Sequence, residues 1–279
     1  MNALGNALGN ALGNASVNPP VNPPVNPRTA STATDEAQRQ EASARPAGAV
    51  DVAAGAAPSG AGRPPGPVRV PASRRLLYDV VGEARRIRYG ANAELLWQQD
   101  GSSYQARLEI AAMFVPRRIQ TSAGQLTTQG LAPQRFSDRL RSELAAHFER
   151  DKGKISFSAN SPDVPLAAGA QDRLSVLMQL GSLVAGEPQR YPKGSSISLQ
   201  TVGPRDADDW RFVVGQEDDL ALPGGPHRAL KLSRAPAREF DLRMDVWLAA
   251  DLAYLPVQLR LTQANGDFVE LQLKSVEIP

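Results

Sequence analysis

The residues best suited to acid–base or metal chemistry are sparse in this chain of 279 residues. It has two histidines, His147 and His227, and no cysteine, which excludes disulfides, thiolate catalysis and cysteine-ligated metal sites. Neither histidine belongs to an HxH or HExxH pattern, so we expect surface or hydrogen-bonded structural histidines. We therefore predict no metal site and no cofactor.

Two acidic runs have residue types that suit cation binding or proton transfer. The first, Asp206, Asp208 and Asp209, lacks the glycine and the terminal glutamate of an EF-hand loop. The second, residues 217–219, has neighbouring carboxylates, which a strand would point to opposite faces. Both are interpreted as exposed acidic turns. The sequence contains no G-x-S-x-G nucleophile elbow and no phosphate-binding glycine loop, so no catalytic residue is predicted.

Residues 170–185 are the segment with helical periodicity, and they open with Gln171 and Asp172. Leucine, methionine, glycine and valine side chains form one stripe, with further leucines beside it, which predicts about four turns. Gly186 is a natural stop for the helix. Capping and the helix dipole account for Asp172, at about 0.5–2 kcal/mol, whereas a catalytic role would need a partner that the sequence does not show.

Most of the other segments alternate between apolar and polar residues, as half-buried strands do. Asp100 and Gly101 favour a two-residue hairpin turn, which would place Trp97 opposite Tyr104. Another turn is predicted at residues 123–124.

The C-terminal hairpin needs a different loop. A two-residue turn would scramble its faces, so the pattern predicts a three-residue loop, residues 264–266, with Gly266 in the left-handed conformation. That loop sets Leu261 opposite Val269.

The expected ten to twelve strands are the number at which an open sheet curls. Because the predicted helix is apolar over most of its circumference, it needs wide cover. We therefore predict a mainly β fold, an antiparallel curled sheet or open half-barrel around one helix. Side chains expected between sheet and helix, as packed core or as the lining of an apolar ligand cavity, are Trp97, Tyr104, Met178 and Trp247.

Residues 1–73 have a different composition from the rest. They begin with Asn-Ala-Leu-Gly three times over and continue rich in proline, alanine, glycine and serine. Each internal glycine costs a helix about 1 kcal/mol relative to alanine. We predict a disordered leader and linker over 1–73 and a single β-rich domain over 74–279.

Charge and hydropathy limit the partners. A formal net charge of +2 is too small to indicate a nucleic-acid or membrane-binding footprint, and we predict no nucleic-acid partner. No apolar run reaches the roughly 18 residues of a transmembrane helix. The first residues lack the basic region and continuous apolar core of a secretory signal, so neither signal peptide nor anchor is recognised.

Several short motifs, in order along residues 74–279, resemble the domain of unknown function 3108 family. The motif that opens the predicted helix, Gln171-Asp172-Arg173-Leu174-Ser175, is the most specific of them. The others are Leu77-Tyr78, Ala93-Glu94-Leu95, Ser122-x-Gly124, Gly130-Leu131-Ala132-Pro133, Trp247-Leu248-Ala249, Leu255-Pro256-Val257 and Asn265-Gly266-Asp267. The resemblance implies an envelope protein of Gram-negative bacteria in or facing the periplasm, and it supplies no catalytic residues.

We therefore expect a non-catalytic periplasmic or envelope-associated protein that holds a lipid or other apolar ligand between sheet and helix. One alternative is a protein-interaction or scaffold module with an envelope protein as its partner. Another is a hydrolase that uses Asp172 or His227, which would require a histidine, a carboxylate and a hydroxyl group to converge in a cleft.

Overall fold

The computed structural model describes residues 66–113, 116–237 and 241–279, so most of the predicted leader lies outside the described residues. The first strands are β1 (Arg74–Ala84), β2 (Ile87–Gln99), β3 (Ser103–Ala111), β4 (Arg118–Thr127), β5 (Gly130–Arg139), β6 (Glu143–Glu149), β7 (Lys154–Phe157) and β8 (Val164–Pro165). The later strands are β9 (Gln171–Asp172), β10 (Ser196–Val202), β11 (Ala207–Leu222), β12 (Gly225–Arg234), β13 (Arg243–Ala249), β14 (Leu255–Thr262) and β15 (Phe268–Glu277). The helices are α2 (Ser175–Gly186) and the short 3₁₀ helices η1 (Arg150–Lys152), η2 (Pro188–Arg190) and η3 (Ala250–Leu252).

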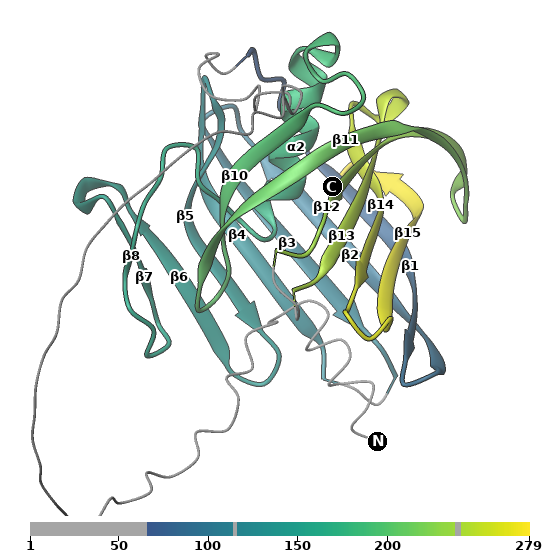
Figure 1. Ribbon diagram of the computed structural model, residues 1–279, viewed down its shortest axis with the longest axis horizontal. Coiled ribbons are helices and arrows are strands. Elements are labelled where there is room, and N and C mark those ends of the chain that lie inside the picture. The colour runs from purple at the N-terminus through teal and green to yellow at the C-terminus, as the bar shows by residue number, and fades with distance from the viewer. Residues whose placement is uncertain (1–65, 114–115, 238–240) are drawn as a thin grey trace, which may run out of the picture. The chain divides into compact units, whose positions relative to one another are not determined.

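In the described part of the chain, all fifteen strands belong to one sheet, in the order β8-β7-β6-β5-β4-β3-β2-β1-β15-β14-β13-β12-β11-β10-β9. Strands β1 and β15 pair in the middle and join two meandering halves. The outer strands β8 and β9 are not paired with each other, so the sheet stays open (Figure 1). The predicted mainly β class is correct.

The expected ten to twelve strands are too few. Strands β8 and β9 have two residues each, too short to show an alternating pattern, and the buried positions of β5 do not alternate regularly. The expectation of a purely antiparallel sheet is also corrected, because β9 pairs with β10 in parallel. The parallel pairing arises because the chain passes through α2 between these two strands.

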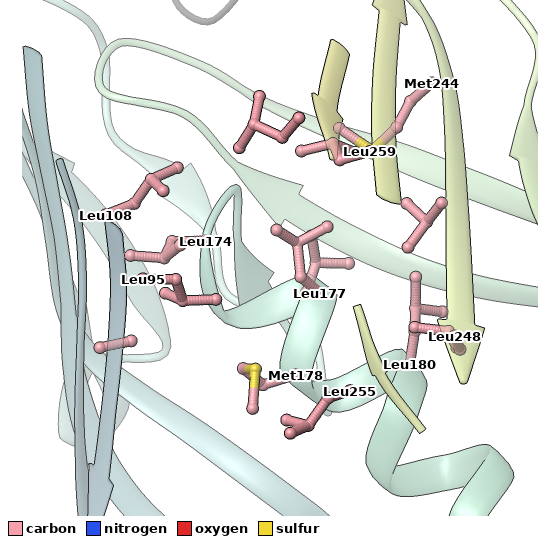
Figure 2. Packing of buried hydrophobic residues seen from close by; sticks show 14 of the residues in the cluster. Leu95, Leu108, Leu174, Leu177, Met178, Leu180, Met244, Leu248, Leu255 and Leu259 are labelled. Carbon is pink, nitrogen blue, oxygen red and sulfur yellow. The ribbon is translucent and has the colours of Figure 1, made fainter. Parts of the chain in front are cut away.

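Helix α2 lies against the concave face of the sheet, and residues 175–184 are all buried. It contacts β5 in one half of the sheet and β14 in the other. Figure 2 shows side chains of α2 between those of the two halves, among them Leu95, Leu108, Leu177, Met178, Leu180, Leu248, Leu255 and Leu259. The helix begins at Ser175, later than predicted, because Gln171 and Asp172 are extended as β9. Among the described residues, no helix combines the length and apolar character needed to cross a membrane.

The C-terminal hairpin has the predicted loop. Leu261 pairs with Val269, and the amide of Gln263 donates to the carbonyl of Asp267 at 2.8 Å, which leaves three loop residues. Gly266 has a φ of 88°, in the left-handed region that glycine adopts readily and residues with a side chain adopt rarely.

The predicted two-residue turn at Asp100 and Gly101 is wrong. Trp97 pairs with Ala106 and Gln99 pairs with Tyr104, and the amide of Asp100 donates to the carbonyl of Ser103 at 3.2 Å, so the two loop residues are Gly101 and Ser102. The Asp100 carboxylate stabilises this shifted loop, because it accepts hydrogen bonds from the amides and hydroxyl groups of the two serines that follow Gly101. The observed strand pairing differs from the predicted pairing by two residues. Because side chains alternate with a period of two along a strand, each one stays on its expected face.

The turn predicted at Ala123 and Gly124 is also absent. Both residues lie inside β4, where the register with β5 shifts between them. A Cβ atom on Gly124 would lie 2.3 Å from the carbonyl oxygen of Ala132. The glycine therefore permits a bulge and a close approach of two strands.

Residues just before β1 already contact the domain. The indole Nε1 of Trp97 donates to the carbonyl oxygen of Pro71 at 3.0 Å. The amide of Arg69 donates to the carbonyl of Ser182 in α2, also at 3.0 Å. These bonds hold the segment across the concave side ahead of the predicted domain boundary at residue 74.

We predict that Gly124→Ala lowers the free energy of unfolding by about 1–3 kcal/mol, because the new Cβ forces neighbouring backbone to move. Gly90→Ala is the matched control: Gly90 is also inside a strand, and the nearest atom to its Cβ position is 3.8 Å away. The control should change stability by less than about 1 kcal/mol. Urea denaturation followed by tryptophan fluorescence measures both, and equal losses would contradict the close-approach explanation.

Candidate functional site

A cavity of about 60 Å³ lies beside the first turn of α2, between the two halves of the sheet. We call it the inner cavity. Its apolar lining consists of Leu108, Leu177, Trp210, Leu242, Met244, Leu259 and Leu261. Its polar lining consists of Gln120, Arg173, Asp206, Asp208, Arg234 and Asp241. The site therefore combines a mainly leucine floor with a concentration of charge.

At the inner cavity the two halves of the sheet meet through side chains alone, without strand pairing. Figure 2 shows Leu177 of α2 between Leu108 of β3 and Leu259 of β14. Strands β3 and β14 belong to different halves of the sheet and are not neighbours in it. Widening the cavity would therefore separate leucine side chains without breaking the hydrogen bonds of a strand pair.

A second, smaller void of about 10 Å³ continues from the inner cavity into the core. Leu108, Leu177 and Leu259 line both spaces. Four further residues line the smaller void but not the inner cavity, namely Tyr78, Leu95, Pro256 and Leu271. Together the two spaces mark an apolar track between α2 and the sheet.

On its other side the inner cavity adjoins a wider polar space of about 390 Å³, which we call the vestibule. Asp208, Arg234 and Asp241 line both. The remaining vestibule residues are Gln200, Ala207, Asp209 and Ala237. From outside to inside, the path thus changes from a wide polar space to a narrow apolar one.

Arg234 is the most enclosed charge between the two spaces, with its side chain 7% exposed. Its guanidinium lies 4.4 Å from the ring centroid of Trp210, and it donates to the carbonyl oxygen of Leu242 at 2.7 Å and to Asp241 at 3.4 Å. Burial lowers the pKa of Arg234, although Asp241 opposes that change. Since arginine remains protonated in proteins, the mouth of the cavity carries a fixed positive charge.

Arg173 is the second cation of the lining. Its Nη2 donates to the Asp206 carboxylate at 3.0 and 3.3 Å. Its Nε is buried and has no hydrogen-bond partner among the described residues. A buried donor without a partner is costly, so a ligand oxygen that reached this atom would be favourable there; the atom lies beside Gly203, where an added Cβ would be 2.8 Å from it.

A separate polar cluster surrounds Asp172 just before α2. The Tyr104 and Ser122 hydroxyl groups lie 3.0 Å apart, and Ser122 donates to Asp172 Oδ2 at 2.5 Å. Asp172 Oδ1 accepts the amides of Leu174 and Ser175 at 2.9 and 2.7 Å. These bonds satisfy amides at the entry to the helix, although the N-cap position itself is Leu174, which makes no side-chain cap hydrogen bond.

Burial raises the pKa of Asp172 to about 6, against the opposing effect of its hydrogen bonds. Burial, and then the adjacent Asp172 carboxylate, also raise the pKa of Tyr104. A carboxylate beside two hydroxyl groups resembles acid–base machinery, but Asp172 and Ser122 are 0% exposed and Tyr104 is 3% exposed. With no route for a substrate, the arrangement connects β3 and β4 to the start of α2.

Two glutamines fasten the same helix to β5. Gln171 donates to the carbonyl of Leu131 at 2.7 Å, and Gln179 accepts the amide of Leu131 at 2.8 Å. Gln179 also donates to the carbonyl of Gln129 at 2.9 Å. These bonds fix the depth of α2 against the concave face.

The four side chains expected to line a ligand cavity lie in different places. Trp97 and Tyr104 stack with ring centroids 5.4 Å apart, and Met178 is buried in α2. Trp247 lies on the other face of the sheet, because its neighbours at 246 and 248 point inward. Its Nε1 donates to Asp218 at 2.9 Å and the Lys231 ammonium lies 4.7 Å from its ring centroid. None of the four lines the inner cavity, and ligand binding by them stays a prediction.

The histidines do not converge with other catalytic groups. His147 is exposed on β6, while Nδ1 of His227 lies 3.0 Å from the Asp251 carboxylate. Among the described residues, no hydroxyl group is hydrogen-bonded to the His227–Asp251 pair, and no cluster of three or more histidine or acidic side chains could hold a metal ion.

The prediction missed the polar residues of the cavity, although some carried a signal. Arg234 follows Leu232 by two positions in β12, so strand alternation directs it inward. Gln120 is also at a buried, inward position of β4, but its inward neighbours Arg118 and Ser122 are polar, so the alternation of β4 gives no such signal. A polar side chain at an inward position is the clue, whereas Arg173 lies outside any strand or helix and gives none.

Comparisons with known proteins agree with this picture of the fold. Residues 86–274 match the model of a family described as "Protein of unknown function (DUF3108)". No curated protein matches the chain. The crystal structure of a β-barrel-like protein of domain of unknown function DUF1849 from Brucella abortus has a TM-score of 0.51 and 12% identity, covering 76% of this chain and 99% of that one. A DUF1329 family protein from Desulfovibrio piger is more distant, with a TM-score of 0.28 and 8% identity over 74% of this chain and 85% of its own. At these identities the first likeness concerns the fold alone, and the second carries no argument.

We predict that Asp172 makes the protein less stable as the pH rises from about 4 to about 7. The folded-state pKa of about 6 exceeds the ordinary value of 3.8, so the native state holds a proton that the unfolded state has released. The contribution present below the ordinary pKa is lost as the pH rises through 6, roughly 3 kcal/mol. Asp172→Asn should remove this slope, measured as the difference in unfolding free energy between variant and wild type at each pH. A difference that does not change with pH would show that the carboxylate stays ionised throughout.

Proposed function

This chain belongs to the DUF3108 family of proteins of unknown function, and we propose that it is a non-catalytic protein that binds an apolar, lipid-like ligand in the inner cavity. The observation that carries the proposal is the change of lining along one path. A charged vestibule leads into a leucine-lined cavity, which continues as an apolar void beside α2. Such a path suits a molecule with a polar end and an apolar chain.

The apolar part of the ligand would lie among Leu108, Leu177 and Leu259, which line both the inner cavity and the smaller void. Burial of apolar surface is favourable by about 25 cal/mol per Å². The cavity of about 60 Å³ must widen to admit a chain. Leucine side chains from the two halves of the sheet would separate to make that room, and no strand pair spans the gap.

The polar end of the ligand would remain at the boundary between cavity and vestibule. Arg234 supplies a fixed positive charge there, and Arg173 Nε supplies a buried donor without a partner in the described part of the chain. The carboxylates of Asp206, Asp208 and Asp241 line the same boundary. A ligand end that accepts a hydrogen bond from Arg173 and also tolerates these acids fits best, which favours an uncharged ester, amide or hydroxyl group over a multiply charged anion.

Binding fits the geometry better than catalysis does. The proposed setting is the periplasm or cell envelope, in keeping with the envelope proteins that the sequence motifs resemble. In that setting a lipid is an abundant apolar ligand, and the inner cavity would shield part of it from water.

We predict that Leu261→Trp, which adds an indole to the lining, reduces ligand uptake at least about tenfold by occupying the space of the apolar chain. Native mass spectrometry of the full chain, isolated from cell envelopes, would show an adduct of lipid mass on the wild type and its loss from the variant. Titration with a fluorescent fatty acid provides the affinity.

Leu230→Trp is the matched control, since Leu230 is a partly buried leucine that does not line the inner cavity. It should retain both the adduct and the affinity. A clean mass for the wild type together with no uptake of the fatty acid would rule out the proposed function. Equal losses in both variants would show that the inner cavity is not the site.

A further inference from the structure

Several connections between strands in the first half of the sheet lie at the same end of the strands, which we call one edge of the sheet. In an antiparallel meander alternate connections share an edge, so the turn between β1 and β2 lies on the same side as the β3–β4 and β5–β6 connections. Figure 1 shows this edge at the bottom of the view, with the β14–β15 turn beside it. Neighbouring strands are about 4.8 Å apart, so successive connections are spaced by roughly 10 Å.

Arginines are concentrated on these connections, and we call the set the arginine rim. Its members, all exposed, are Arg85, Arg86, Arg88, Arg117, Arg139 and Arg141. The small net charge of the whole chain hides this concentration. An expectation of no membrane-binding footprint, based on net charge alone, therefore does not describe this edge.

Half of the rim arginines have no acidic partner. Arg88 lies 3.5 Å from Glu83 and Arg117 lies 2.8 Å from Glu109. Arg139 is opposite Glu143 in the register of β5 and β6. In the described part of the chain Arg85, Arg86 and Arg141 form no ion pair, so three unpaired charges face solvent along one edge.

Exposed apolar side chains lie among these charges. Ile87 in the β1–β2 hairpin is 64% exposed, and Met113, just after β3, is 78% exposed. They are among the most exposed large hydrophobic residues in the described part of the protein. Arginines interspersed with protruding apolar side chains are the composition by which proteins bind the interface of anionic membranes.

From the exposed arginines and the protruding apolar side chains among them, we propose that the arginine rim docks the protein on a membrane that contains anionic phospholipid. The inner cavity lies toward the same edge, since Met244 and Leu261 are close to the ends of their strands there. Docking would therefore bring the cavity mouth near the lipid. Docking by the arginine rim does not depend on what the cavity binds.

The test is sedimentation of the full chain with phosphatidylcholine vesicles, with and without phosphatidylglycerol. Binding should require phosphatidylglycerol and weaken as salt is added. Arg86→Gln with Arg141→Gln should weaken it roughly thirtyfold, from about fivefold for each basic residue at an anionic surface. The matched control, Lys193→Gln with Arg211→Gln, removes two exposed positive charges elsewhere and should change binding less than about twofold.

The apolar part has its own variant. Ile87→Ser with Met113→Ser should abolish the binding that remains at high salt, because burial of apolar side chains is not screened. No binding to phosphatidylglycerol vesicles at low salt, or equal weakening by the rim variant and its control, would overturn the proposal. Rim-dependent binding to polyglutamate without binding to the vesicles would also overturn it, in favour of an acidic protein partner.

Failure of this inference and failure of the proposed function can be told apart. Leu261→Trp should bind vesicles as the wild type does, while Arg86→Gln with Arg141→Gln should still take up the fluorescent fatty acid in solution. Far-ultraviolet circular dichroism checks that each variant is folded, and all four rim substitutions are at exposed positions.

Discussion

The need to shield helix α2 from water on all sides is the constraint on which the rest of this structure depends. Ten consecutive residues of the helix are buried, so it presents no face to water along that length. A flat sheet would cover one side of such a helix and leave the other exposed. The pairing of β1 with β15 places the first and last strands in the middle of the sheet, and each half then rises along one side of α2. The concave shape follows from the need to bury this one element.

Burial of the helix also requires that its polar start be satisfied. The carboxylate of Asp172 is fully buried, which is unfavourable unless hydrogen bonds compensate for the lost water. Ser122 and the first amides of the helix supply those bonds. Because these partners come from β4 and from α2 itself, the compensation also sets the position of the helix. A group that looks catalytic in isolation is here a structural connection between elements that are distant in sequence.

The open sheet has a functional consequence. A closed barrel would join β8 to β9 through hydrogen bonds, whereas here the two halves face each other across side chains near the start of α2. The inner cavity occurs where leucines from β3, β14 and α2 do not fill that space completely. The inner cavity is therefore a product of this incomplete closure.

The sequence by itself determined the mainly β class, the apolar helix and the loop at Gly266. Each of these depends on residues close together in the chain, where side-chain periodicity and turn geometry act directly. It misplaced the turns at Asp100 and Ala123, because a carboxylate network favours a loop one residue later in the first case, and in the second a bulge in β5 opposite Gly124 lets β4 continue. The inner cavity, its Arg173 and Arg234, and the arginine rim were decided by tertiary structure alone. Their residues come from strands and connections far apart in sequence, and only the pairing of the sheet and its curvature around α2 bring them together.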